Sequence, residues 1–211
     1  LGINQLIKLR VMDLSGNQLT SFPSGFESWS GLVSLSFGET LDKGKESITQ
    51  MIGNRLDTIP PNIALLKNLE TLDVSNNNIK QVPSQIQGLI KLRVFNIFNN
   101  PISNLPSEIG RLTNLEELYI STRYTARSKI SQLPKSFQQL TKLKQLALED
   151  TDLPIPPEIL KLTKQPQTIL NYYFSHSQRP LNQIKLIIVG QGSVGKTSLI
   201  RQILYREFNP K

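Results

Sequence analysis

Cysteine is absent from the 211 residues of this chain, and histidine occurs only once, at His176. The first absence excludes disulfides, thiol nucleophiles and thiolate metal sites, and we expect a cytoplasmic protein. The single histidine argues against a histidine metal cluster. No apolar run reaches the roughly 18 residues that a membrane-spanning helix needs, so no membrane span is predicted. A signal peptide and an initiator methionine are also lacking, and we expect the chain to be a fragment of a longer protein.

Acidic residues are scarce toward the C-terminal end. The whole chain has 24 Lys and Arg residues against 16 Asp and Glu, which gives a formal net charge of +8. Residues 1–162 hold 17 basic against 15 acidic residues, whereas residues 163–211 hold 7 against 1. A basic excess is typical of proteins that bind nucleic acid or anionic membranes. Here it surrounds a glycine-rich loop, so we interpret it as phosphate-binding charge and expect no nucleic-acid partner.

An apolar residue followed by proline recurs along most of the chain. The apolar positions are Phe22, Ile59, Val82, Leu105, Leu133 and Ile155. Pro60, Pro83 and Pro106 lie 23 residues apart. The clearest unit is residues 69–91, and its residues 69–89 read Leu-x-x-Leu-x-Val-x-x-Asn-x-Ile-x-x-Val-Pro-x-x-Ile-x-x-Leu, with x for other residues. This spacing resembles the leucine-rich repeat, in which each unit contributes one short strand to a stacked array.

Six segments occupy the strand position of this repeat. They are residues 9–15, 32–38, 69–75, 92–98, 115–121 and 143–149. One unit cannot bury its own leucines, but stacked neighbours bury them together. The sequence therefore predicts a leucine-rich repeat solenoid over residues 1–162, a horseshoe with parallel strands on its concave face. We expect its N-terminal end to be truncated, because no polar capping segment precedes the first repeat.

A polar residue follows each predicted strand at a fixed slot. The slot holds Asn17, Asn54, Asn77 and Asn100, and then Ser128 and Thr151 in the last two units. An inward amide at this place can bond backbone groups of its own turn and of the neighbouring repeat. We therefore expect a ladder of asparagine hydrogen bonds that weakens in the last two units. Trp29 falls in the slot of Leu89 and Leu112, which indicates a core residue rather than a ligand contact.

Two insertions interrupt the repeat, one of 14 residues within residues 39–53 and one of 5 residues within residues 122–127. Both follow a strand on the same rim, where insertions often build binding surfaces. Tolerated variation in loop length is the alternative. Phe98 and Tyr119 are aromatic where the pattern predicts exposure on the concave face, as diagonal neighbours on adjacent strands. They are candidate anchors for a protein partner, although single exposed apolar residues are also ordinary.

The repeat ends after Leu162, and residues 163–183 are predicted to be a capping helix and a linker. Pro166 suits the first turn of that helix. Its apolar face, expected to cover the core of the last repeat, holds Ile169, Leu170, Tyr172, Tyr173 and Phe174. A polar, basic linker is predicted over residues 175–182. We expect His176 to be solvated there.

Residues 190–197 read Gly-Gln-Gly-Ser-Val-Gly-Lys-Thr, the pattern of a phosphate-binding loop. An apolar run over residues 185–189 precedes it, and residues 199–204 have helical spacing, so the required strand, loop and helix are in order. Lys196 is expected to reach the β- and γ-phosphates, and the Thr197 hydroxyl to bind Mg²⁺. Backbone N–H groups of the loop are expected to surround the phosphates. The predicted nucleotide site comprises Gly190, Gln191, Gly192, Ser193, Val194, Gly195, Lys196, Thr197 and Ser198.

The order of these parts resembles the Roco family, most closely its prokaryotic type. The repeats are followed by Ile-Leu-Asn-Tyr-Tyr-Phe, then Arg-Pro-Leu-Asn, then the glycine-rich loop. In that family a Ras-like GTPase domain called Roc follows the repeats, with a dimerising COR domain and, in some members, a kinase beyond it. The resemblance implies a signalling switch that binds GTP or GDP with Mg²⁺, hydrolyses GTP slowly and dimerises through COR. Residues 184–211 are then the first strand, loop and helix of a truncated Roc domain, so the whole chain is expected to be α/β.

Two other interpretations remain open. One is an ATPase of the immune-receptor type, in which the nucleotide domain usually precedes the repeats. The other is a protein-binding module without a switch. Nothing in the 211 residues selects guanine over adenine, and no catalytic residue can be assigned. We expect the chain as given to lack GTP turnover, because one strand and one helix do not complete a parallel sheet.

Overall fold

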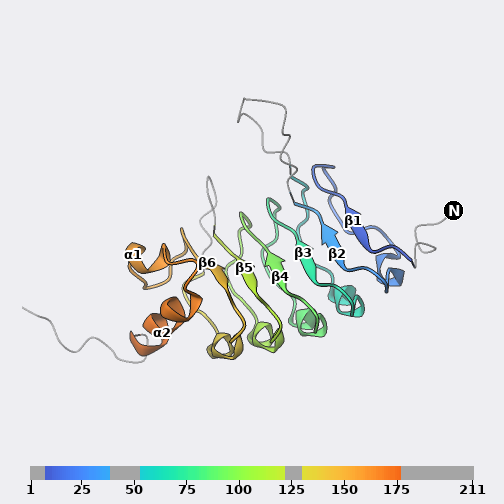
Figure 1. Ribbon diagram of the computed structural model, residues 1–211. Helices are drawn as coiled ribbons and strands as arrows, with labels where there is room; N and C mark the ends of the chain where they lie inside the picture. Colours follow the sequence, from blue (N-terminus) through green and yellow to red (C-terminus); the bar gives the residue numbers. More distant parts are fainter. Residues whose placement is uncertain (1–7, 39–52, 122–129, 177–211) are drawn as a thin grey trace, which may run out of the picture. The chain divides into compact units, whose positions relative to one another are not determined.

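The computed structural model describes residues 8–38, 53–121 and 130–176. The chain divides into two units, Leu1–Gln178 and Arg179–Lys211, and every described residue belongs to the first. In that unit six parallel strands form one sheet in the order of the sequence (Figure 1). The strands are β1 (Val11–Asp13), β2 (Ser34–Ser36), β3 (Thr71–Asp73), β4 (Val94–Asn96), β5 (Glu117–Tyr119) and β6 (Gln145–Ala147). Each repeat thus adds its strand beside the strand before it.

Each strand lies inside a predicted strand segment, but it is only three residues long. After β1, β3, β4 and β6 the chain soon leaves the sheet, because the third residue beyond the strand takes a left-handed conformation. Gly16, Asn76, Asn99 and Asp150 hold this place, with φ of 68°, 54°, 53° and 58°. Glycine, asparagine and aspartate tolerate positive φ better than other residues. The residue types after these four strands therefore explain why their strands are shorter than the repeat suggests.

A short 3-10 helix forms the opposite side of each of five repeats (Figure 1). These helices are η2 (Phe26–Ser28), η3 (Pro61–Leu65), η4 (Ser84–Gly88), η5 (Ser107–Arg111) and η6 (Lys135–Gln139). From η3 onward the proline of the apolar-proline pair directly precedes the helix. In η4 the carbonyl of Pro83 accepts the N–H of Ile86 at 3.0 Å. Because proline fixes its own φ near −65°, it sets the point where extended chain turns into helix.

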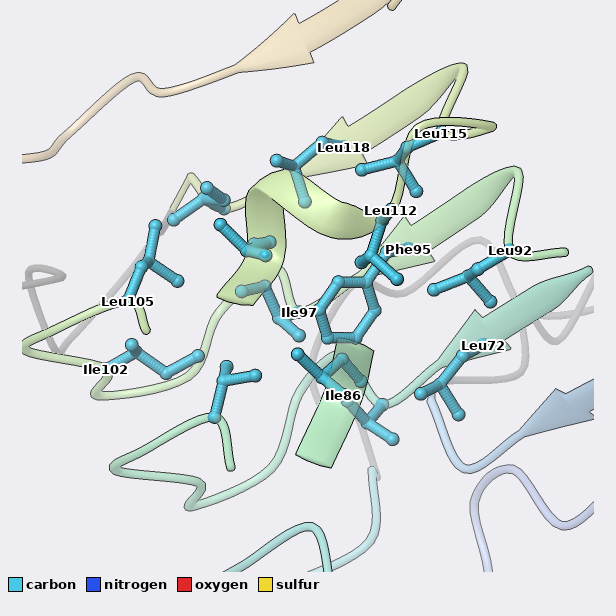
Figure 2. Packing of buried hydrophobic residues seen from close by; sticks show 14 of the residues in the cluster. Leu72, Ile86, Leu92, Phe95, Ile97, Ile102, Leu105, Leu112, Leu115 and Leu118 are labelled. Carbon is cyan, nitrogen blue, oxygen red and sulfur yellow. The ribbon is translucent and has the colours of Figure 1, made fainter. Parts of the chain in front are cut away.

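One continuous apolar core fills the space between the sheet and the 3-10 helices. Leu72, Phe95 and Leu118 from neighbouring strands point into it, together with Ile86 from η4 (Figure 2). Trp29 is 0 % exposed and ends η2 at the position that Leu89 and Leu112 occupy in η4 and η5. The prediction that Trp29 is a core residue is therefore confirmed.

The helices pack closely enough that some positions admit no side chain. A Cβ atom added at Gly110 of η5 would overlap the Cβ and the carbonyl oxygen of Ser136 in η6. The backbones of the two helices are therefore held at a spacing that only glycine permits. The Oγ of Ser136 is buried at this contact without a hydrogen-bond partner among the described residues.

The asparagine ladder exists in the middle of the solenoid. The amide of Asn77 donates to the carbonyls of Val74 and Ser75 in its own repeat, and to that of Phe37 in the repeat before. Its Oδ1 accepts the N–H of Leu56 at 2.9 Å. One buried side chain thus satisfies four backbone groups of two repeats, which a buried turn requires.

Asn54 and Asn100 make the same kind of bonds. The amide of Asn54 donates to two carbonyls and its Oδ1 accepts the N–H of Leu19 at 2.7 Å. The amide of Asn100 donates to three carbonyls and its Oδ1 accepts the N–H of Ile79 at 2.9 Å. The predicted ladder is therefore confirmed over these repeats.

The ladder changes at both ends of the described array. Asn17 is exposed and donates to the carbonyl of Ser15, two residues away. The prediction of an inward amide is wrong at this position, where the amide bonds a carbonyl of its own turn. Thr151 donates through its hydroxyl to the carbonyl of Leu148 at 2.7 Å, within its own repeat. The predicted weakening is confirmed at Thr151, whereas Ser128 lies outside the described residues.

Two short α-helices follow β6. They are α1 (Pro157–Leu160) and α2 (Pro166–His176). Helix α2 begins at the predicted proline and buries Ile169, Leu170, Tyr173 and Phe174 against the core. The hydroxyl of Tyr173 also accepts the N–H of Leu133 at 3.0 Å. The predicted capping helix is therefore confirmed.

The predicted linker begins too early. Ser175 and His176 belong to α2, where the Ser175 hydroxyl donates to the carbonyl of Tyr172 at 3.1 Å. The imidazole ring of His176 stacks on the Tyr172 ring at a centroid distance of 4.2 Å. These local contacts extend the helix into residues that composition alone assigns to a linker. His176 is exposed, as expected. No helix within the described ranges is long and apolar enough to cross a membrane.

Candidate functional site on the concave face

The strand register places alternate residues in columns on the face that points away from the core. The first column holds Val11, Ser34, Thr71, Val94, Glu117 and Gln145, and the second holds Asp13, Ser36, Asp73, Asn96, Tyr119 and Ala147. A third column follows two residues further along each strand: Ser15, Gly38, Ser75, Phe98, Ser121 and Glu149. These eighteen positions include four acidic residues and no lysine or arginine. A chain of net charge +8 therefore has an acidic concave face.

Side chains of the second column are largely bonded within the sheet on β1, β3 and β4. The carboxylates of Asp13 and Asp73 each accept the backbone N–H two residues further along, at 3.0 and 2.8 Å. Asn96 makes the same bond at 3.0 Å, and its amide also donates to Asp73 Oδ2 at 3.0 Å. Such local bonds hold the turn after each strand. The main role of these polar side chains is therefore to hydrogen-bond the backbone of the turns.

The same slot on β5 and β6 holds Tyr119 and Ala147, neither of which can cap a turn in this way. The N–H of Glu149 instead donates across to the Oγ of Ser121 at 3.1 Å. Ser121 and Ala147 are small and buried. Because small side chains lie here beside larger ones, the surface is hollowed between β5, β6 and α1.

We call this feature the concave hollow, and its volume is about 870 Å³. Its lining consists of Phe98, Tyr119, Ser121, Gln145, Ala147, Glu149, Asp150, Thr151, Asp152, Leu153, Ile155, Pro157, Leu160, Lys161 and Thr163. Part of the lining is apolar and buried, at Leu153, Ile155 and Leu160. The charged part comprises three exposed carboxylates and one ammonium group, a formal balance of −2. The volume lies in the range of pockets that accommodate a small ligand or a few side chains.

Tyr119 is fixed in the hollow by its neighbour in the first column. Its hydroxyl donates to Glu117 Oε2 at 2.6 Å. Burial, and then the hydrogen bond and negative charge of Glu117, raise the pKa of Tyr119 to about 12. The phenol therefore stays neutral well beyond physiological pH, and its ring is held in one orientation at the edge of the hollow.

A second charged cluster lies at the start of the strands and has a structural explanation. Glu116 accepts from Arg93 at 3.0 Å and from Lys144 at 2.6 Å. The hydrogen bond from Arg93, followed by that from Lys144, lowers the pKa of Glu116 to about 2. Surface ion pairs of this kind contribute little to stability. The shallow depression there, about 240 Å³, contains groups that pair with one another, and we assign it no ligand.

The structure brings Phe98 and Tyr119 together as the sequence predicts. Tyr119 pairs with Asn96, and Phe98 lies two residues beyond Asn96, so the two rings are diagonal neighbours. Both are partly buried and both line the concave hollow. Their contact with a partner stays a prediction. Sequence reasoning missed Asp150, Asp152 and Lys161, because the turn back to α1 brings them to the sheet.

The other predicted sites lie outside the described residues. These are the loop residues Gly190 to Ser198, including Thr197 as the Mg²⁺ ligand, and nearly all of both insertions. Within residues 8–38, 53–121 and 130–176, no group of three or more His, Cys, Asp or Glu side chains is placed to hold a metal ion.

Comparisons with known proteins match the repeats. Residues 53–102 and residues 8–29 each match a sequence profile described as leucine rich repeat. Adenylate cyclase from Schizosaccharomyces pombe is 40 % identical over 81 residues, covering 34 % of this chain and 5 % of that enzyme. The chain therefore spans only a small part of this curated relative.

Solved structures show the same architecture. The plant peptide hormone receptor RGFR1 in complex with RGF2 is similar with a TM-score of 0.54 and 29 % identity, over 69 % of this chain and 21 % of that chain. The ectodomain of the receptor kinase GASSHO1/SCHENGEN3 from Arabidopsis thaliana gives a TM-score of 0.56 at 20 % identity, over 77 % and 21 %. The chain thus spans about a fifth of either receptor chain. Together with the stacked parallel strands and the asparagine ladder, these matches identify the described part of the chain as a leucine-rich repeat solenoid.

Proposed function

We propose that the chain is a protein-binding module that receives its partner on the concave face. The observation that supports this most directly is the hollow, in which two aromatic rings, Phe98 and Tyr119, stand beside exposed carboxylates. Aromatic side chains at a concave site are typical anchors of protein interfaces, since they lose much water-exposed apolar surface on binding. The other face of the sheet is filled by the core, so it offers no comparable surface.

Rigidity supports the same proposal. The asparagine ladder and the bonds of Asp73 and Asn96 hold the strand-end turns in fixed positions. A surface that is ordered before binding loses little conformational entropy when the partner arrives. The similar solved structure with 29 % identity is a peptide hormone receptor in complex with RGF2, which is consistent with partner binding by this fold.

Affinity capture tests the proposal with a matched control. We expect the double variant Phe98→Ala/Tyr119→Ala to retain at most about a tenth of the partner protein that the wild-type chain captures from cell extract, measured by quantitative mass spectrometry. The control variant Leu65→Ala/Ile90→Ala removes two exposed apolar side chains, which are 52 % and 57 % exposed and lie outside the concave columns. Equal partner profiles for all three proteins would refute the use of the concave face.

We further propose that residues 184–211 add a nucleotide-binding switch of the Roc type, which binds GTP or GDP. The supporting observation is the complete motif Gly190 to Thr197 between an apolar run and a segment of helical spacing. The donor set suits the chemistry, because Lys196 and successive backbone N–H groups match phosphate oxygens, and the Thr197 hydroxyl is a hard oxygen ligand for Mg²⁺. When bound, Mg²⁺ neutralises phosphate charge. The matches reported above concern the repeats, so this second proposal depends on the motif alone.

Guanine specificity and dimerisation through a COR domain belong to this second proposal. Its test is the binding of fluorescent GTP and fluorescent ATP to the natural protein in the presence of Mg²⁺. We expect GTP to bind more tightly than ATP, and Lys196→Ala to weaken binding at least about a hundredfold. Preference for ATP would favour the ATPase interpretation. Absence of any Lys196-dependent binding would leave the repeat-only module as the function.

A further inference from the structure

We propose that the concave hollow binds one arginine side chain of an extended peptide segment, an inference that rests on the proposed protein-binding function. Its lining combines two features that few side chains can match together. One is an apolar, buried part formed by Leu153, Ile155 and Leu160. The other is the exposed carboxylate group of Glu149, Asp150 and Asp152.

Arginine matches both features. Its three-carbon stem buries well against apolar surface while its guanidinium group stays among polar partners. The planar guanidinium group also pairs with carboxylates through two parallel hydrogen bonds, and it stacks on aromatic rings. The hollow supplies carboxylates from the β6 side and the rings of Phe98 and Tyr119 from the β4 and β5 side. Lysine, which has a compact ammonium group, gains less from a flat ring and cannot form the paired bonds.

Charge complementarity favours a cationic side chain over an acidic or neutral one. Three carboxylates and one ammonium group line the hollow, and none of the eighteen column positions is lysine or arginine. Glu117 adds a further carboxylate beside Tyr119, within the first column. The acidic field is local, because the chain as a whole has a net charge of +8. An acidic segment placed here would meet like charges, which disfavours its binding.

A peptide segment fits better than a free small cation, because the hollow continues into the ordered concave sheet. The neighbouring strands β3 and β4 present Asp73 and Asn96 at the next positions of the second column. Adjacent strands lie about 4.8 Å apart, so a segment that crosses them passes a polar side chain at each strand. The open face along β3 and β4 thus contacts the part of the peptide that lies on one side of its arginine.

The experiment uses a random dodecapeptide library displayed on phage, selected against the 211-residue chain. We expect the enriched peptides to share one arginine. The best peptide is then synthesised with arginine, with lysine and with citrulline, the uncharged isostere, and its binding is measured by fluorescence anisotropy. Citrulline should weaken binding at least about tenfold, and lysine by about three- to tenfold.

Variants of the chain locate the arginine. Glu149→Gln and Asp152→Asn should each weaken binding of the arginine peptide by about three- to tenfold, without weakening binding of the citrulline peptide. Glu158→Gln and Asp57→Asn are matched controls, because both residues are exposed and neither lines the hollow. A loss of binding that is the same for both peptides would indicate misfolding. Circular dichroism of each variant distinguishes misfolding from the loss of a binding contact.

The outcomes separate this inference from the proposed function. The arginine assignment is overturned if the enriched peptides lack arginine, or if Glu149→Gln and Asp152→Asn do not change peptide binding. The proposal of a protein-binding face would still stand. An empty selection also overturns the arginine assignment, and the proposed function is then decided by its own capture experiment with whole proteins. Enriched peptides that share an arginine, together with the charge-dependent losses of binding described above, support both the arginine assignment and the proposed protein-binding function.

Discussion

On β1, β3 and β4, the second-column residue is Asp or Asn, and its side chain accepts the backbone N–H two residues on. On β5 and β6 the same position holds Tyr119 and Ala147, and the N–H of Glu149 turns to Ser121 instead. The first region uses its polar groups to hold its own turns. In the second region carboxylates and aromatic rings line a hollow, and this part of the face is the candidate binding surface.

The buried side of the turns differs between the same two regions. In the middle of the array Asn77 links four backbone groups of two repeats, whereas Thr151 at the end bonds one carbonyl of its own repeat. The end is closed by α2 instead, through its apolar face and the bond from Leu133 to Tyr173. The interior of the array is thus stabilised by hydrogen bonds that recur in each repeat, and its end by contacts of α2 that no other repeat has among the described residues.

The largest expected effect comes from breaking the ladder. Asn77→Ala removes the partners of three carbonyls and of the Leu56 N–H, all buried. We expect the free energy of unfolding in urea to fall by about 2 to 4 kcal/mol. Thr151→Ala, which removes one bond, is the comparison and should cost about 1 kcal/mol or less. Equal losses at the two sites would show that the ladder is no stronger in the interior than at the end.

A smaller loss is expected from the closing helix. Tyr173→Phe leaves the buried N–H of Leu133 without its acceptor. The expected cost is about 1 to 2 kcal/mol in the same urea experiment. Tyr172→Phe, on a partly exposed neighbour in the same helix, is the control and should stay within about 0.5 kcal/mol. If Tyr173→Phe is equally neutral, α2 closes the array through apolar contact alone.

Most of the repeat region could be predicted from the sequence, because its physics is periodic. The spacing of leucines gave the six strand positions, and the slot of Trp29 gave its burial. Periodic reasoning failed where neighbours are not equivalent. Asn17 has the ladder residue type, but it is exposed and bonds a carbonyl of its own turn. His176 has linker-like neighbours, but stacking on Tyr172 keeps it in α2.

The candidate site could be predicted only in part, for a related reason. Phe98 and Tyr119 were identifiable because they break the polar pattern of a face that the register defines. Asp152 and Lys161 belong to a turn and a short helix that follow no repeat, and only the folded chain places them beside β6. A sequence states which residues share a strand face, but not which irregular segment closes over it.

Exchanging the two surface types tests the comparison directly. Asp73→Ala removes the acceptor of the Ser75 N–H and of the Asn96 amide, so we expect a loss of about 1 kcal/mol in stability. Arginine-peptide binding should weaken by less than about twofold, because Asp73 lies beside the path of the peptide and does not line the hollow that holds the arginine. Tyr119→Asn places a capping side chain in the hollow region. It should weaken the peptide about tenfold while stability changes by about 1 kcal/mol or less. If Asp73→Ala weakens peptide binding more than Tyr119→Asn does, the arginine lies near β3 and not in the hollow, and the comparison of the two regions is wrong.

The smallest expected effect is a shift in the titration of Tyr119, which reports how far the hollow excludes water. Burial is the largest cause of its raised pKa, ahead of the hydrogen bond and charge of Glu117. The neutral phenol is favoured in the folded state, so its contribution to stability is present below pH 10 and is lost as pH rises from 10 to about 12. Ultraviolet difference spectra against Tyr119→Phe isolate this one tyrosine. Glu117→Gln should lower the pKa only part of the way toward 10, because the desolvated ring remains. A fall all the way to 10 would mean that Glu117, and not burial, sets the titration, and the hollow would then be more open to water than its lining indicates.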